Sequence, residues 1–79
     1  MTNKEAVLGV LKQYSCLNST QIKGFAHRMF NVDFTPQTAV GILRPFIEKG
    51  MVSKSPDPNT GKMVYWLTEY GKEKLNELS

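Results

Sequence analysis

The chain contains a single cysteine and a single histidine among its 79 residues. One cysteine cannot form an internal disulfide, and Cys16 with His27 is too small a ligand set for a structural zinc site. We interpret Cys16 as a buried or bystander thiol and His27 as a polar surface residue. The sequence also has no nucleophile–base pair and no phosphate-binding glycine loop, so we expect neither an enzyme nor a cofactor.

Long hydrophobic runs are missing as well. No segment approaches the ~20 consecutive apolar residues of a membrane-spanning helix. At the amino terminus, Glu5, Gly9 and Lys12 interrupt the apolar residues, so no signal-peptide core is present. We therefore expect a soluble, cytoplasmic protein without a membrane partner. Internal repeats, low-complexity runs and linkers are also lacking, which predicts one domain over residues 1–79.

Basic residues outnumber acidic ones. Ten Lys and Arg against seven Asp and Glu give a formal net charge of +3. This balance favours a polyanionic partner, although many small proteins carry such a charge for solubility alone.

Apolar residues recur with helical spacing in the first part of the chain. Residues 3–14 form one amphipathic pattern, capped by Thr2 or Asn3. Its inward positions are Ala6, Val7, Val10, Leu11 and Tyr14. Leu8 lies outside this arc, so we expect it to be exposed or to contact another chain. A second helix is predicted over residues 20–30, ending at Asn31 because asparagine tolerates the left-handed conformation.

The third predicted helix starts at Thr35 and Pro36, a capping threonine followed by a proline in the first turn. It ends at Gly50. Its inward positions are Ala39, Val40, Leu43, Phe46 and Ile47. Pro45 lies inside it, where its ring meets the carbonyl of Gly41. We therefore predict a kink or a 3₁₀-like turn near Gly41.

After Gly50 the hydrophobic period changes from 3.6 to 2. Residues 51–55 and 62–67 are predicted strands, joined by a turn rich in proline, asparagine and glycine. Thr68 caps a last helix that extends to about Leu78 and buries Gly71, Leu75 and Leu78. The predicted fold class is mainly α with a small β-hairpin (α+β), in the order helix-helix-helix-strand-strand-helix.

Two motifs carry a family resemblance. The segment from Thr38 to Val52, with Glu48-Lys49-Gly50 near its end, resembles a recognition helix and the turn that follows it. The segments 57–62 and 65–71 are similar to a wing tip and a "Y-x-L-T-E-x-G" junction. Together these motifs resemble the winged helix-turn-helix regulators of bacteria and archaea, of the MarR, PadR and HxlR kind.

The resemblance implies double-stranded DNA as the partner, with the third helix in the major groove and the hairpin wing on the backbone or minor groove. The protein is then expected to be a transcriptional regulator or a phage- or plasmid-type accessory protein. The implied base contacts are Gln37, Thr38 and Arg44. The implied phosphate contacts are Ser19, Thr20, Gln21, Lys23, His27, Arg28, Thr35, Lys54 and Lys62. The simpler interpretation is that Thr35 only caps its helix and that the charged residues are ordinary solvated side chains.

The predicted recognition helix departs from the family pattern. Its middle is Val40-Gly41-Ile42, and Pro45 follows, so few side chains remain to specify bases. Specificity is then modest, needs a homodimer or protein partner, or is absent. The alternative is a protein–protein docking module on the same scaffold. Leu8, Ile42 and Trp66 are the apolar residues that would form its surface.

Overall fold

Reciprocal capping bonds fix the starts of the first two helices in the computed structural model, which describes residues 1–78. In α1 (Asn3–Gln13), the Thr2 N–H donates to Glu5 Oε1 at 3.0 Å and the Glu5 N–H donates to Thr2 Oγ1 at 3.1 Å. In α2 (Ser19–Phe30), Asn18 and Gln21 exchange the same two bonds at 2.9 Å each. Each pair satisfies N–H groups that have no partner within the helix.

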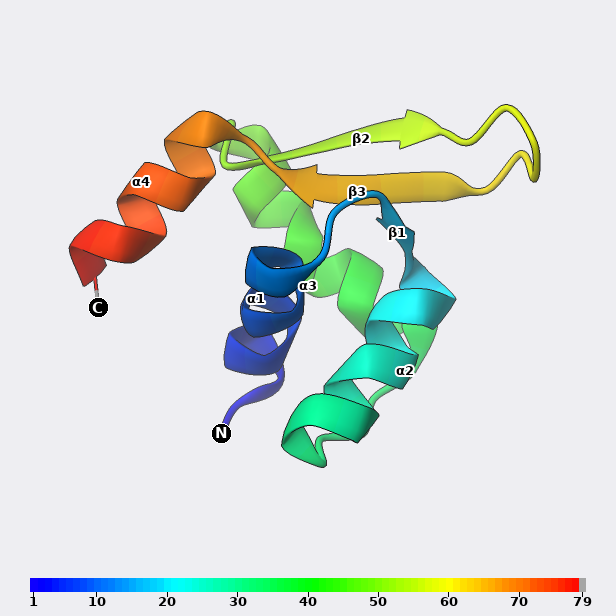
Figure 1. The fold of residues 1–79 in the computed structure, drawn as a ribbon, viewed down its shortest axis with the longest axis horizontal. Helices are drawn as coiled ribbons and strands as arrows, with labels where there is room; N and C mark the ends of the chain where they lie inside the picture. The colour runs from blue at the N-terminus through cyan, green and yellow to red at the C-terminus, as the bar shows by residue number, and fades with distance from the viewer. Residues whose placement is uncertain (79) are drawn as a thin grey trace.

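The helix α1 lies between α2, α3 and the strand β3 (Figure 1). Ala6, Val7 and Val10 are fully buried, as predicted. Leu8 is only 9% exposed, so the prediction of an exposed leucine is wrong. The reason is that α1 is covered by neighbouring elements on several sides, so residues outside its predicted inward arc are buried as well. Tyr14 was predicted to face inward but is 45% exposed, because α1 ends at Gln13 and the Tyr14 backbone is extended.

The helix α3 (Pro36–Glu48) begins where Thr35 Oγ1 accepts the Thr38 N–H at 3.1 Å, with Pro36 in the first turn as predicted. It is α-helical along its whole length, so the predicted 3₁₀-like turn is wrong, and the alternative, a kink near Gly41, stays a prediction. The Pro45 ring crowds the carbonyl of Gly41. The helix accommodates this contact because Gly41 is exposed and has no side chain to resist a small backbone shift.

The helices support a three-stranded antiparallel sheet made of β1 (Leu17–Asn18), β2 (Val52–Pro56) and β3 (Met63–Leu67). Its order is β1-β3-β2, with β2 and β3 forming the predicted hairpin. The sequence interpretation missed β1. Tyr65 and Leu67 are buried, whereas Val64 and Trp66 are only half-buried, as the predicted alternation requires.

The last helix, α4 (Glu69–Leu78), projects from the end of the molecule opposite the hairpin tip (Figure 1). The Thr68 hydroxyl accepts the Gly71 N–H at 3.0 Å and donates to the Gly50 carbonyl at 2.7 Å. Leu75 is buried as predicted, and the Leu78 side chain lies outside the described residues. The observed order therefore matches the predicted helix-helix-helix-strand-strand-helix class, with β1 added.

Candidate nucleic-acid interface

The exposed side of α3 is narrow and carries few polar side chains. At 100° per residue, Gln37, Gly41, Arg44 and Glu48 fall within an arc of about 60°, opposite the buried Ala39. All four are exposed, and Glu48 adds an acidic side chain at the end of the arc. The amide of Gln37 and the guanidinium of Arg44 thus flank a position that has no side chain.

Thr38 differs from the other two predicted base contacts. It is half-buried, and its hydroxyl lies 3.0 Å from Thr35 Oγ1. The start of α3 is also less open to an anion than the sequence suggests. Pro36 has no N–H, the Thr38 N–H donates to Thr35 Oγ1, and the Ala39 N–H donates to the Thr35 carbonyl at 3.2 Å. Within residues 36–39, the Gln37 N–H is therefore the one backbone donor that takes part in neither of these two bonds.

Two of the predicted phosphate contacts on α2 group with an aromatic residue. Gln21, Gly24, Phe25 and Arg28 line a shallow hollow of about 260 Å³. The Arg28 guanidinium lies over the Phe25 ring, 5.8 Å from its centroid. The Tyr14 ring stacks on Phe25 with centroids 4.4 Å apart.

The remaining α2 residues lie elsewhere. Lys23 and His27 occupy a different edge of the helix, about 100–160° around from Gln21 and Arg28. His27 Nδ1 lies 2.9 Å from the carboxylate of Asp33. This acid competes with a phosphate for the imidazole. At the start of the helix, Thr20 is exposed and Ser19 is half-buried. The structure therefore divides the predicted α2 contacts between two edges.

The hairpin carries its two predicted lysines on opposite arms, and both are exposed. Lys54 pairs with Tyr65 in the β2–β3 register, and Lys62 directly precedes β3. The turn between them is internally bonded. The Gly61 N–H donates to the Asp57 carbonyl at 2.7 Å, and the Asp57 N–H donates to the Lys62 carbonyl at 2.8 Å. Gly61 takes a φ of 72°, which favours glycine.

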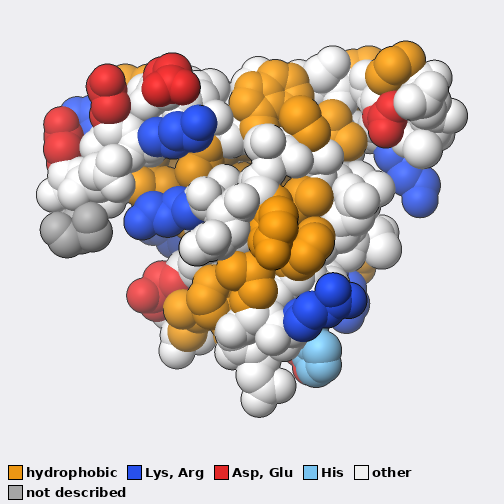
Figure 2. Space-filling model, in the orientation of Figure 1, with side chains coloured by type: hydrophobic (Ala, Val, Ile, Leu, Met, Phe, Trp, Pro, Cys, Tyr) orange, Lys and Arg blue, Asp and Glu red, His pale blue; other side chains and the backbone are white. Residues whose placement is uncertain are grey.

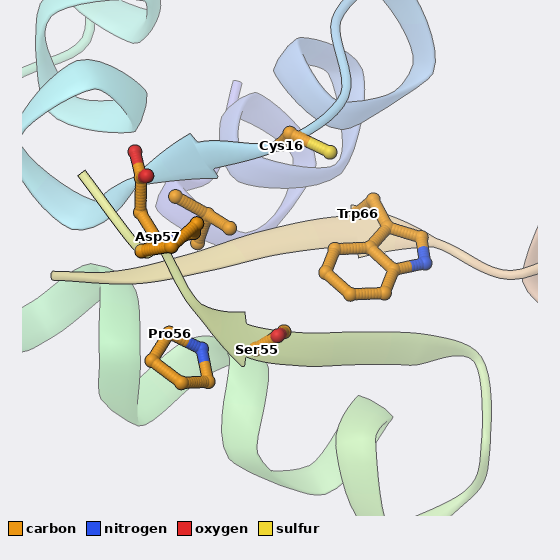
Figure 3. A pocket seen from close by; sticks show the side chains of 7 residues that line it. Cys16, Ser55, Pro56, Asp57 and Trp66 are labelled. Atoms are coloured by element: carbon orange, nitrogen blue, oxygen red, sulfur yellow. The ribbon is translucent and has the colours of Figure 1, made fainter. Parts of the chain in front are cut away.

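A pocket on the outer face of the sheet was not predicted. It encloses about 370 Å³ and is lined by Cys16, Ser55, Pro56, Asp57, Pro58, Val64 and Trp66 (Figure 3). Val64 and Trp66 alternate with the buried Tyr65 in β3 and so share its outer face, whereas the hairpin prolines and Cys16 come to this face only through the fold. Cys16 is exposed, with a φ of 59°, so the thiol is not buried.

The predicted docking surface is not present as proposed. Leu8 belongs to the core, and Ile42 packs partly buried against it, which leaves Trp66 in the outer pocket. Hydrophobic side chains do gather over the sheet and, separately, between α1 and α2 on the face shown in Figure 2.

Residues 1–78 lack the features of a metal centre and of a membrane span. No group of three or more His, Cys, Asp or Glu residues in this range is placed to hold a metal ion. None of the described helices is long and apolar enough to span a bilayer.

Comparison with solved structures identifies the fold. F93 from STIV, a winged-helix DNA-binding protein, superposes with a TM-score of 0.79 at 22% identity, over 96% of this chain and 82% of F93. A MarR family transcriptional regulator from Silicibacter pomeroyi gives 0.76 at 24% identity, over 98% of this chain and 48% of the regulator. Bacillus subtilis PadR in complex with operator DNA gives 0.73 at 21% identity, over 95% and 45%.

The chain thus spans about half the length of the MarR-type and PadR proteins. No protein-family model and no curated protein matches it. At these identities the likeness shows that the chain has the winged-helix fold.

Proposed function

We propose that this winged-helix chain binds double-stranded DNA, with α3 in the major groove and the β2–β3 hairpin on the backbone or in the minor groove. The observation that carries the proposal is the exposed arc of α3. It presents Gln37 and Arg44 to solvent while Ala39 and Leu43, on the opposite side, are fully buried. A helix with one buried face and a polar outer face has the width that the major groove admits.

The two exposed side chains suit base edges. A glutamine amide pairs bidentately with adenine, and an arginine guanidinium pairs bidentately with guanine. Thr38 takes a secondary role at the helix start, because its hydroxyl already contacts Thr35. Each good bidentate pair contributes about 1–3 kcal/mol of discrimination, so two such residues give modest specificity. A homodimer or a protein partner would increase it.

Phosphate contacts come from the remaining predicted residues. On the hairpin these are Lys54 and Lys62, both exposed. On α2 and at the start of α3 they are Ser19, Thr20, Gln21, Lys23, His27, Arg28 and Thr35. Because His27 already faces Asp33 at 2.9 Å, it contributes less than the lysines. The protein acts as a transcriptional regulator, or as an accessory protein of a phage or plasmid, in the cytoplasm and without catalytic activity.

Salt dependence tests the proposal directly. Fluorescence anisotropy of a labelled random-sequence duplex, titrated with protein at several salt concentrations, should give a log affinity that falls linearly with log salt. The slope should correspond to several phosphate contacts. Affinity that does not change with salt, or no binding at low salt, would overturn the proposal.

A second candidate function, docking to another protein, rests on the outer sheet pocket around Trp66 and Val64. Two sets of variants separate the candidates. If Gln37→Ala, Arg44→Ala and Lys62→Ala abolish biological activity while Trp66→Ala preserves it, DNA binding is the function. If Trp66→Ala abolishes activity and the other three variants preserve it, docking to a protein is the function.

A further inference from the structure

Four of the six glycines are required by the fold itself. Gly50 and Gly61 have φ angles of 79° and 72°, in the left-handed region. A Cβ on Gly9 would come within 2.8 Å of the Phe30 ring, and one on Gly71 would overlap the Met51 carbonyl. Each of these positions has an internal reason to lack a side chain.

Gly24 and Gly41 have no such requirement. Both are exposed and lie inside helices, and a Cβ at either would meet no atom of the described residues within 4 Å beyond its chain neighbours and the adjacent backbone of its own helix. Glycine destabilises a helix interior relative to alanine. Gly41 is the more informative of the two, because it lies on the exposed arc of α3 and, along the helix, between Gln37 and Arg44.

Pro45 adds a second observation at the same place. In an α-helix the N–H of residue 45 donates to the carbonyl of residue 41, and proline has no N–H. The Gly41 carbonyl therefore lacks its regular intrahelical donor on the exposed arc. A glycine at position 41 can shift away from the Pro45 ring, which explains why residue 41 is glycine when residue 45 is proline. This does not explain why the helix contains the two residues together. Each destabilises the helix, and both are exposed, so neither is required for core packing.

We propose that this pair serves main-chain readout of DNA, an inference that rests on the proposed function. Gly41 lets the α3 backbone approach the base edges, and its carbonyl, which has no Pro45 N–H as its regular donor, accepts a hydrogen bond from an exocyclic amino group. In the major groove those donors are the N6 amino group of adenine and the N4 amino group of cytosine. Every base pair presents one of these amino groups in the major groove, so the contact distinguishes which strand carries the donor at this position.

The flanking residues fit this arrangement. Gln37 is four residues before Gly41 and Arg44 is three residues after it, so both lie on the same side of the helix as Gly41. A close approach at Gly41 brings both side chains toward neighbouring bases. The sparse middle of α3 then becomes a contact surface in its own right.

The test uses Pro45→Ala, which restores the N–H and returns the Gly41 carbonyl to the helix. A duplex is first selected from a random-sequence pool by the wild-type protein. Each adenine or cytosine in it is then replaced, one at a time, by an analogue without the exocyclic amino group. At one position the wild-type protein should lose roughly tenfold in affinity, whereas Pro45→Ala should bind that analogue and the parent duplex equally. An adenine that pairs with Gln37 is distinguished from this position because its loss of the amino group affects both proteins.

Two further variants keep the test independent of folding. Gly41→Ala should bind the selected duplex roughly tenfold more weakly, because the added methyl group holds the backbone away. Asn76→Ala, a charge-neutral change on α4 outside the proposed interface, is the control and should bind as the wild-type protein does. Thermal melting establishes that each variant is folded.

Three results would overturn the inference. In the first, Gly41→Ala binds the selected duplex as tightly as the wild-type protein. In the second, Pro45→Ala remains as sensitive as the wild-type protein to loss of the amino group. In the third, no amino group affects binding by the wild-type protein. If the wild-type protein selects no duplex at all, the proposed function fails and this inference fails with it.

Discussion

At the scale of single residues, Gly71 shows how tightly α4 is joined to the rest of the molecule. A Cβ at this position would overlap the backbone carbonyl of Met51, which cannot move without disturbing β2. We expect Gly71→Ala to lower the free energy of unfolding by about 1–3 kcal/mol or more, the usual cost of overpacking. Urea denaturation followed by circular dichroism measures this change.

Gly24→Ala is the matched control, because it introduces the same methyl group into open space. The variant should be more stable by roughly 1 kcal/mol, the difference in helix propensity between glycine and alanine. Equal effects of the two substitutions would contradict the close packing of Gly71 against Met51.

Glu5 makes the stability of α1 depend on pH. The N–H of Thr2 donates to its carboxylate, and this hydrogen bond holds the pKa of Glu5 below its ordinary value. A lowered pKa in the folded state stabilises the protein above the ordinary pKa, and this contribution disappears as the pH falls through the lowered value. An NMR titration of Glu5 should therefore show a pKa below that of the unfolded chain.

Thr2→Ala supplies the comparison for that titration, because it removes the hydroxyl that accepts the Glu5 N–H at 3.1 Å and weakens the capping box. Because the Thr2 N–H, the main cause of the lowering, remains in this variant, the pKa of Glu5 should rise only part of the way toward its ordinary value. An unchanged titration curve would show that the Thr2 hydroxyl does not contribute to the lowering.

Sequence patterns predicted the caps well and some exposures poorly. Thr2, Thr35 and Thr68 cap their helices as expected, because capping depends on residues only a few positions apart. Exposure depends on what packs against a helix. Leu8 is buried because α1 has neighbours on several sides, and Tyr14 is exposed because α1 ends before it.

At the scale of secondary-structure elements, the long periodic segments were predictable and the short one was not. β1 contains two residues and pairs only with β3, so it has no periodicity to detect. Its partner strand is more than 40 residues away in sequence. The 3₁₀-like turn near Gly41 was wrong because propensity rules overstate the effect of Pro45 in a helix that is packed along its other face.

The β2–β3 hairpin is the element whose proposed contacts are easiest to isolate. Replacing both Lys54 and Lys62 by alanine removes two exposed positive charges from its arms. If each lysine contacts a phosphate, the slope of log affinity against log salt should become shallower by roughly two units. Titrations of a labelled duplex at several salt concentrations measure the slope.

A charge-matched control is available on α4. Lys72 Nζ lies 3.7 Å from Glu69 Oε1, and Lys74 Nζ lies 3.3 Å from Glu77 Oε2. Both lysines are outside the proposed interface. Their double replacement by alanine changes the net charge equally but should leave the slope unchanged. Equal losses in the two double variants would mean that binding follows net charge and not the hairpin.

At the scale of the whole molecule, the fold assigns its surfaces to different sides. α3 lies behind α1 in the view of Figure 1, with its buried face toward the core, so its exposed arc is turned away from the hydrophobic groups visible in Figure 2. The outer sheet pocket is lined by Trp66 and the hairpin prolines. Because the hairpin is also proposed to contact DNA, DNA binding and docking at this pocket would use the same element.

The candidate site could be predicted only in part. The sequence correctly indicated the exposure of Gln37 and Arg44, because helical periodicity determines which face a residue occupies. It did not indicate the pairing of His27 with Asp33, nor that the contacts of α2 are divided between two edges. Those features depend on the loop between α2 and α3 and on the aromatic stack at Phe25.

The central claim is that α3 and the β2–β3 hairpin form the surface that contacts duplex DNA. The most direct test is an NMR titration of isotope-labelled protein with duplex DNA at low salt, followed through the backbone amide signals. We predict that the signals of α3 and of the hairpin, residues 36–48 and 52–67, shift most, and that added salt reverses the shifts. Shifts confined to α4, or no shifts in α3 and the hairpin, would contradict the claim.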